Sequence, residues 1–167
     1  ISGHAFSSLD HVSRLIQWST GPMTALVTLR LQDNSIADEG IAVLADALIS
    51  PSCCKLRVLQ LDGNHIGDAG CQALAIALRE KTLALRTLKL DRQKKSRISV
   101  AGVGAISESL SCDFCSLEIL SFSGNKSIGC ECADRLARAI MSRQGKEGAV
   151  SELYLSGTGV SDDGAKS

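Results

Sequence analysis

Two stretches of 23 residues decide the fold of this chain. "LVTLRLQDNSIADEGIAVLADAL" runs from Leu26 to Leu48, and "LRVLQLDGNHIGDAGCQALAIAL" runs from Leu56 to Leu78. Eleven of the 23 aligned positions are identical, and the other twelve differ freely. Identical residues at a fixed spacing, with variable residues between them, indicate a structural repeat. The chain is therefore expected to build one unit several times.

The first half of each copy predicts a short strand. Its anchors follow the form L-x-x-L-x-L and alternate with polar residues, as in "LVTLRL". Such alternation is typical of a strand with one buried face. From middle anchor to middle anchor the steps are 30, 29, 32 and 33 residues, so the later copies are slightly stretched. The five middle anchors are Leu29, Leu59, Leu88, Leu120 and Leu153.

The second half of each copy predicts a helix. In the first copy, apolar residues recur with the i, i+3, i+4, i+7 spacing of one helix face, at Ile41, Leu44, Ala45 and Leu48. Asp38 and Asp68 stand at the start of two such helices, and we expect each carboxylate to cap the helix that it precedes. One strand–turn–helix unit cannot bury its own apolar face, but stacked units can. The repeat therefore predicts a curved α/β solenoid, with parallel strands on the concave face and helices on the convex face.

The motif "LxxLxLxxNxIxDxG…LAxAL" resembles the leucine-rich repeat, in its long helical subtype. The Cys-x-Leu entries to the strands in "SPSCCKLRVLQL" and "CDFCSLEILSF" are also similar to that subtype. This subtype occurs in ribonuclease inhibitor, in NOD-like receptors and in the Ran GTPase-activating protein. The resemblance covers about residues 20–167. It is specific for the fold, but it implies little about function because the fold presents many unrelated surfaces.

The domain organisation follows from the repeat. Residues 1–167 are expected to form a single domain of about five strand–helix repeats, cut from a longer array. Residues 1–19 contain no strand motif, and "SSLDHVSRLIQW" predicts the N-terminal helix of a first, partial repeat. The third copy, "LKLDRQKKSRISVAG", has three added residues and no Asn in its turn. In the fourth copy, Cys130 and Cys132 replace the Asp and Gly.

The cysteines are candidate metal ligands. Cys112-x-x-Cys115 and Cys130-x-Cys132 could together suggest a four-thiolate zinc site. However, Cys115 precedes the fourth predicted strand and the second pair follows it, so a strand of roughly 20 Å separates the two pairs. Cys54 and Cys115 share a position that another copy fills with Leu, which favours buried structural thiols. No metal site is predicted.

Two rows of polar residues recur in the repeat and are candidate functional rows. The first row consists of asparagines. It is either a polar binding surface or an amide ladder that satisfies backbone groups where each strand turns away, and the ladder is favoured. The second row consists of aspartates. It is better explained by helix capping than by catalysis, because no His or second carboxylate recurs beside these aspartates. No catalytic or cofactor-binding residue is predicted, and the chain is expected not to be an enzyme. The rows are Asn34, Asn64 and Asn125, and Asp38, Asp68 and Asp162.

Composition and charge narrow the classes of partner. The chain has 18 basic and 18 acidic residues, so no net charge draws it to nucleic acid or to an acidic membrane. No apolar run approaches the ~20 residues of a membrane helix. The seven cysteines are an odd number without regular spacing, which favours reduced thiols and a cytoplasmic location. We therefore expect another protein as the partner.

The variable positions of the strands are the candidate partner-binding residues. In-register strands would place them in rows across the concave face, about 4.8 Å apart. They mix charged, amide and aliphatic side chains with the single Tyr, which is typical of an interface. The inserted stretch 91–97 is a second candidate site, because Arg92, Lys94, Lys95 and Arg97 concentrate positive charge there. The predicted partner-binding residues are Arg30, Gln60, Asp62, Lys89, Asp91, Arg92, Ile119 and Tyr154.

The leading hypothesis for function is a non-catalytic scaffold that binds a partner protein through the concave face. Two alternatives rest on the family resemblance: a regulator of another enzyme in trans, as a GTPase-activating or inhibitor module, and a ligand-sensing segment of an innate-immune NOD-like receptor. A solvated spacer within a longer array is the remaining interpretation. Apolar solenoid ends would also allow weak homo-association.

Overall fold

A computed structural model describes residues 26–49, 55–94, 98–143, 145 and 149–160 of the chain. Within these ranges strands and helices alternate, as the repeat predicts. The strands are β1 (Thr28–Arg30), β2 (Val58–Gln60), β3 (Thr87–Lys89), β4 (Ile119–Ser121) and β5 (Glu152–Tyr154). The helices are α2 (Asp38–Leu48), α3 (Asp68–Leu78), α4 (Val100–Leu110) and α5 (Cys130–Met141). The helix predicted within residues 1–19 lies outside the described residues.

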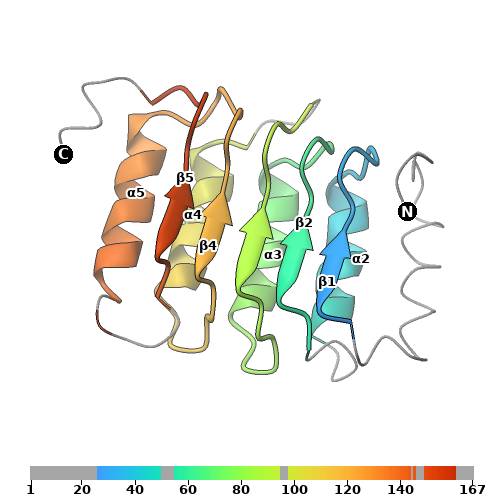
Figure 1. Cartoon of the computed structure of the whole chain (residues 1–167). Coiled ribbons are helices and arrows are strands. Elements are labelled where there is room, and N and C mark those ends of the chain that lie inside the picture. The colour runs from blue at the N-terminus through green and yellow to red at the C-terminus, as the bar shows by residue number, and fades with distance from the viewer. Residues whose placement is uncertain (1–25, 50–54, 95–97, 144, 146–148, 161–167) are drawn as a thin grey trace.

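The strands form one parallel sheet in the order β1-β2-β3-β4-β5. Figure 1 shows them side by side on one face, with helices α2 to α5 behind them. The predicted fold is confirmed: an α/β solenoid with strands on the concave side and helices on the convex side. The predicted rows are also in register, since pairing runs along Arg30, Gln60, Lys89, Ser121 and Tyr154.

The core lies between the sheet and the helices. On the sheet side, the middle anchors Leu59, Leu88 and Leu120 are fully buried. On the helix side, the apolar stripe predicted for α2 buries Ile41, Leu44, Ala45 and Leu48. Each fully buried aliphatic side chain of this size stabilises the fold by about 1.5–3 kcal/mol. Each helix also packs against its neighbours, α2 on α3, α3 on α4 and α4 on α5, so stacking completes the burial of these stripes.

The helix caps differ from the expectation. Asp38 does not cap α2: its Oδ1 accepts hydrogen bonds from the backbone N–H groups of Gly67, at 2.7 Å, and Gly70, at 3.0 Å, at the start of α3. Asp68 likewise accepts from the N–H groups of Ser99, at 2.7 Å, and Gly102, at 2.9 Å, at the start of α4. The prediction that each carboxylate caps its own helix was therefore wrong. Each carboxylate reaches across to the next repeat.

This inter-repeat cap explains why a Gly follows two residues after the Asp in the motif. A Cβ atom at Gly70 would lie 2.6 Å from Asp38 Oδ1, and one at Gly102 would lie 2.5 Å from Asp68 Oδ1. Side chains cannot approach this closely, so the glycine leaves room for the carboxylate of the preceding repeat. The Asp and the Gly of the motif thus form a contact between neighbouring units, which is absent from any single unit.

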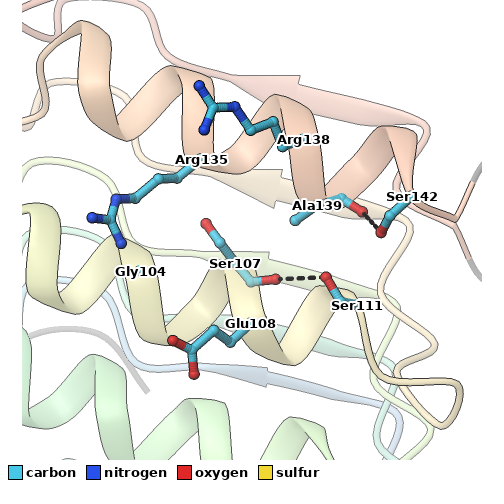
Figure 2. A pocket seen from close by; sticks show the side chains of 8 residues that line it. All are labelled: Gly104, Ser107, Glu108, Ser111, Arg135, Arg138, Ala139 and Ser142. Carbon is cyan, nitrogen blue, oxygen red and sulfur yellow. Dashed lines mark hydrogen bonds between the residues drawn. The ribbon is translucent and has the colours of Figure 1, made fainter.

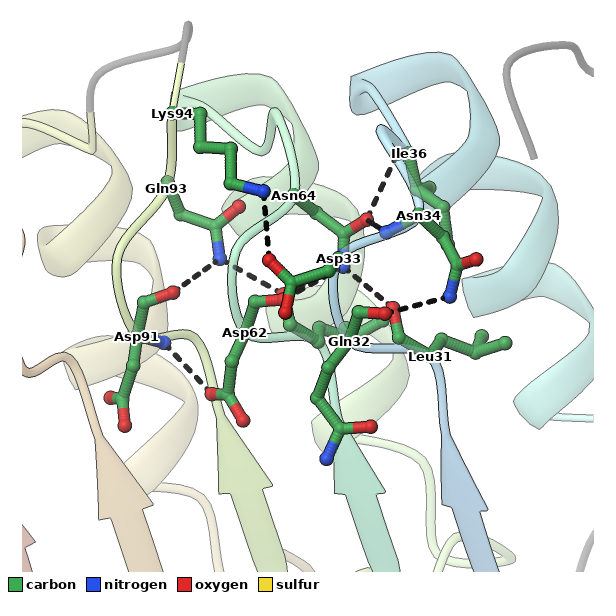
Figure 3. A network of polar contacts seen from close by, with 11 residues as sticks. Leu31, Gln32, Asp33, Asn34, Ile36, Asp62, Asn64, Asp91, Gln93 and Lys94 are labelled. Carbon is green, nitrogen blue, oxygen red and sulfur yellow. Dashed lines mark hydrogen bonds and ion pairs between the residues drawn. The ribbon is translucent and has the colours of Figure 1, made fainter. Parts of the chain in front are cut away.

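The amide ladder is present at the turns. Asn64 Oδ1 accepts from the N–H groups of Asn34 and Ile36, and Asn64 Nδ2 donates to the carbonyls of Leu31 and Leu61 (Figure 3). The third copy lacks the Asn, and Gln93 takes its place. Gln93 Oε1 accepts from the N–H of Ile66 at 3.0 Å, and its Nε2 donates to the carbonyl of Leu61 at 3.0 Å. One longer amide therefore continues the ladder through the insertion.

Candidate functional site

The concave face consists of three in-register rows of variable side chains. The first row, at the start of the strands, is Thr28, Val58, Thr87, Ile119 and Glu152. The second row, at their last residues, is Arg30, Gln60, Lys89, Ser121 and Tyr154. A third row lies two residues further on, at Gln32, Asp62, Asp91, Ser123 and Ser156. Seven of the eight predicted partner-binding residues belong to these rows, and Arg92 lies one residue beyond the third.

The N-terminal end of the second row is positively charged. Arg30 is exposed, and its Nε donates to Gln60 Oε1 at 2.9 Å. Gln32 Nε2 donates to the same oxygen at 2.8 Å. Gln60 thus holds two neighbours in place across β1 and β2. Because an amide is neutral, this arrangement fixes the Arg30 side chain without neutralising its charge.

The centre and the C-terminal end of the concave face are more open. Lys89 is half-buried, and its ammonium group makes no hydrogen bond or ion pair with any residue that the structure describes. Ile119, also half-buried, lies beside Thr87 on the next strand. Tyr154 is 47% exposed, and its hydroxyl donates to Glu152 Oε2 at 2.7 Å. This bond to a carboxylate raises the pKa of Tyr154, so its hydroxyl stays a donor.

Asp62 and Asp91 are less available than the sequence suggests. Asp62 is only 7% exposed, and its Oδ1 accepts from the N–H of Asp91 at 3.1 Å. Asp91 Oδ1 in turn accepts from the N–H of Ser123 at 2.8 Å and from the hydroxyl of Ser121. These carboxylates form a second ladder beside the amides. Burial raises the pKa of Asp62, and the hydrogen bond from Asp91 only partly offsets this.

The described part of the basic insertion, residues 91–94, contacts the first two repeats through Gln93 and Lys94. Lys94 Nζ lies 2.7 Å from Asp33 Oδ1, although the two residues are 61 positions apart (Figure 3). This ion pair lowers the pKa of Asp33. Lys94 is therefore occupied, whereas Arg92 is exposed and lies at the rim of the concave face. Lys95 and Arg97 lie outside the described residues.

A shallow depression of about 280 Å³ separates α4 from α5 on the convex side (Figure 2). Ser107 Oγ donates to the carbonyl of Val103 at 2.8 Å, and Ser142 Oγ donates to that of Ala139 at 2.7 Å. These hydroxyls are therefore bonded to their own helix turns. The lining contains Arg135, Arg138 and one carboxylate, that of Glu108, which forms an ion pair with Arg79 at 3.1 Å. It offers a surface between two helices and no paired nucleophile and base.

Three of the five described cysteines are buried, as predicted for Cys115, whereas Cys112 and Cys130 are half-buried and Cys54 lies outside the described residues. Cys71, Cys115 and Cys132 are at most 2% exposed, and burial raises the pKa of all three thiols. A raised pKa keeps them as neutral thiols, which are poor nucleophiles and poor metal ligands. In the described part of the chain, no group of three or more His, Cys, Asp or Glu side chains could hold a metal ion.

Known proteins share both the repeat and the fold. A profile of the family described as Leucine Rich repeat matches residues 23–45 and 52–75. Over 142 residues, or 85% of this chain, the sequence is 30% identical to a ribonuclease inhibitor from Sus scrofa. The chain is a leucine-rich-repeat protein of the ribonuclease-inhibitor-like subtype. Leucine-rich-repeat domains generally mediate interactions between proteins.

This leucine-rich-repeat chain is also similar to longer proteins. It is 33% identical over 95 residues to the NACHT, LRR and PYD domains-containing protein 9C of Mus musculus. The aligned part covers 29% of the ribonuclease inhibitor and 9% of the mouse protein, so the chain spans less than a third of either relative. The solved structure of Leiomodin-1 Actin-Binding Site 2 (ABS2) has the same fold, with a TM-score of 0.67 and 21% sequence identity over 90% of this chain and 80% of that chain. Among the described residues, every helix is too short or too polar to cross a membrane.

Proposed function

We propose that this leucine-rich-repeat segment is a non-catalytic scaffold that binds a partner protein through its concave face. The observation that carries the proposal is the second row, which brings exposed Arg30, half-buried Lys89 and exposed Tyr154 into one register line across the sheet. Arg and Tyr are the side chains that most often dominate binding energy at protein interfaces. Charged groups around an exposed aromatic ring form a surface suited to another protein.

The polar groups of the described residues support binding over catalysis. The carboxylates of Asp38, Asp62, Asp68 and Asp91 accept backbone N–H groups of neighbouring repeats. General acid–base chemistry needs a carboxylate, imidazole or thiol that can reach a substrate and change its proton. In this protein the recurring carboxylates are held in structural bonds, so they serve the fold.

The test of this proposal is affinity capture from a source-cell lysate, with mass spectrometry of the captured proteins. One bait is the wild-type chain, and the second carries Arg30→Ala, Lys89→Ala and Tyr154→Ala together. A third bait carries Gln72→Ala, Arg79→Ala and Arg138→Ala on the exposed helix side. We expect a protein that the wild type and the helix-side bait capture and that the concave-face bait loses. Equal capture by all three baits would contradict the proposal.

A second candidate function is inhibition of an enzyme in trans. The observation that favours it is the 30% identity over 142 residues to a protein named ribonuclease inhibitor. Inhibition would use the same concave face to cover an active site. A ribonuclease assay with increasing amounts of the chain tests it directly. Unchanged cleavage at a large excess of the chain would remove ribonucleases as the target.

A further inference from the structure

Charge is segregated along the concave side of the solenoid. The strand segments of the first three repeats, residues 26–34, 56–64 and 85–94, carry six Lys or Arg residues and three Asp residues. The equivalent segments of the last two repeats, residues 117–125 and 150–158, carry two Glu residues and neither Lys nor Arg. These segments of a chain without net charge therefore have an excess of positive charge over β1, β2 and β3 and of negative charge over β4 and β5, although Glu118 forms an ion pair with Arg86 between the two ends.

The three carboxylates of the positive end are already engaged. Asp62 and Asp91 accept backbone N–H groups of the next repeat, at 3.1 Å and 2.8 Å. Asp33 pairs with Lys94. Asp62 also lies within electrostatic reach of Lys89 and Arg92, so the acidic groups offset part of the positive charge, and an excess of three Lys or Arg residues over Asp residues remains.

The cations that remain lie close together. Arg30 is bonded to the neutral amide of Gln60, and Lys89 makes no ion pair with a described residue. Their strands are separated only by β2, which places their Cα atoms roughly 10 Å apart at the usual strand spacing. Arg92 extends the strip at the rim, and it also makes no ion pair within the described part of the chain.

The backbone conformation of Arg92 determines where its side chain lies. Arg92 has a φ angle of +50°, in the left-handed region that a long side chain rarely adopts. The second, fourth and fifth turns have Gly63, Gly124 and Gly157 at this position, and the first turn has Asp33, with a φ angle of +56°. A Cβ atom at Gly124 would lie 2.6 Å from the Arg92 Cγ atom, so the stem of Arg92 rests over that glycine. The stem of Arg92 thus lies against the fourth repeat, beside the strip.

We propose that Arg30, Lys89 and Arg92 bind an acidic segment of the partner protein. This inference rests on the proposed function, and it adds the chemistry of the partner and its orientation. In an extended peptide of the polyproline II type, carboxylates three residues apart lie on the same side, about 9 Å apart, which matches the spacing of Arg30 and Lys89. The acidic segment would lie over β1, β2 and β3, while Glu152 would repel it from the far end of the sheet.

A protein segment fits this strip better than a single-stranded nucleic acid does. Proteins that bind single strands combine cations with aromatic rings on which bases stack. The three cations have no aromatic side chain among them. The exposed Tyr154 lies on β5, at the negative end, and its hydroxyl is bonded to Glu152.

The test uses fluorescence anisotropy with the whole chain and three labelled probes: a ten-residue glutamate peptide, a ten-residue lysine peptide and a ten-nucleotide thymidine strand. The variants are Arg30→Glu, Lys89→Glu and Arg92→Glu. The matched control is Arg138→Glu, which makes the same charge change on exposed α5. Circular dichroism of each variant verifies that it is folded.

We expect the wild type to bind the glutamate peptide, and each concave-face reversal to weaken this binding by at least about threefold. Arg138→Glu should change it less than twofold by the same reasoning, because that charge lies on the other face. The inference is overturned if the glutamate peptide does not bind, if all four variants weaken it equally, or if the thymidine strand binds more tightly. The two proposals can fail separately. If the glutamate peptide does not bind, but the concave-face bait still fails to capture a protein that the wild type captures, then the proposed function is supported and the acidic segment is ruled out.

Discussion

At the scale of single residues, the turn amides connect the repeats. Asn64 lies in a fully buried position and makes hydrogen bonds to the backbone of its own repeat and of the preceding one. Backbone groups buried without a partner are costly, so each turn depends on the amide that faces it. The amide therefore contributes to stability by keeping the backbone groups of two repeats bonded where the strands end.

Asn64→Ala tests this role. The change leaves the N–H groups of Asn34 and Ile36 and the carbonyls of Leu31 and Leu61 without their amide partner. We expect the free energy of unfolding to fall by about 3 kcal/mol, measured by urea denaturation. Gln72→Ala, on the exposed side of α3, is the control and should change it by less than about 0.5 kcal/mol. A loss no larger than that of the control would show that water replaces the ladder.

Asp62 predicts a pH dependence of stability. Burial raises its pKa in the folded protein above the usual value of 3.8. The folded state therefore holds the proton more tightly than the unfolded chain does. Its stabilising contribution is complete below the unfolded pKa and is lost as the pH rises through the folded pKa.

Asp62→Asn should remove this dependence and keep the acceptor for the Asp91 N–H. We expect the variant to be at least as stable as the wild type at neutral pH. The difference between them should shrink as the pH is lowered toward the usual carboxyl value of 3.8. Urea denaturation across this pH range measures it. A wild type that gains stability relative to the variant as the pH rises would contradict the assigned direction.

At the scale of elements, the starts of α3 and α4 are each capped by a carboxylate from the preceding helix. The carboxylate of Asp68, on the first residue of α3, caps the first turn of α4. We expect Asp68→Ala to destabilise the protein by about 1–2 kcal/mol. Amide hydrogen exchange gives the sharper test, because the N–H groups of Ser99 and Gly102 should exchange faster while those at the start of α3 are unchanged. Faster exchange at α3 instead would mean that Asp68 caps its own helix.

Two glycines in α4 allow the effects of helix propensity and of steric crowding on stability to be measured separately. Ala is favoured over Gly in a helix by about 1 kcal/mol, so Gly104→Ala should stabilise the protein by up to about that amount. A Cβ atom there would meet only the tip of Arg135, at 3.4 Å. Gly102→Ala should instead destabilise by about 1–3 kcal/mol, because its Cβ atom would lie 2.5 Å from Asp68 Oδ1. Thermal denaturation of both variants checks the opposite signs, and a stabilising Gly102→Ala would refute the crowding.

The elements themselves could be predicted from the sequence, because their signals are local. Anchors such as Leu59 alternate within a strand, and the apolar residues of α2 recur within two turns of the helix. The contacts between repeats could not be predicted in this way. They join residues about thirty positions apart, and the local spacing of apolar residues does not indicate such contacts. For this reason the cap of Asp68 was assigned to the wrong helix, and Gln93 went unrecognised as a member of the amide ladder.

At the scale of the whole molecule, the repeat makes neighbouring units depend on one another. Amides, carboxylates and glycines all act across the boundary between units, so stability is expected to accumulate by nearest-neighbour contacts. The pairing of Lys94 with Asp33 reaches further, from the third repeat to the first. The same stacking arranges the variable residues into rows and leaves a charge gradient along the concave face.

The candidate site was predictable to a lesser extent than the fold. The rows followed from the strand register, and the structure places Arg30, Lys89 and Tyr154 as the sequence predicts. The sequence did not reveal that Asp62 is buried, because its burial depends on the turn of the next repeat. Nor could the strained backbone of Arg92 be inferred from residue type. Which side chains remain available to a partner is decided by contacts between repeats.

The most direct test of binding through the concave face is covalent footprinting of the wild-type chain, alone and with the protein that it captures. Lysine acetylation and tyrosine iodination are read by mass spectrometry. We predict that the partner protects Lys89 and Tyr154, and that exposed Lys55 and Lys81, outside the three rows, react as before. Protection of Lys81 with unchanged labelling of Lys89 and Tyr154 would place the interface elsewhere and contradict the account.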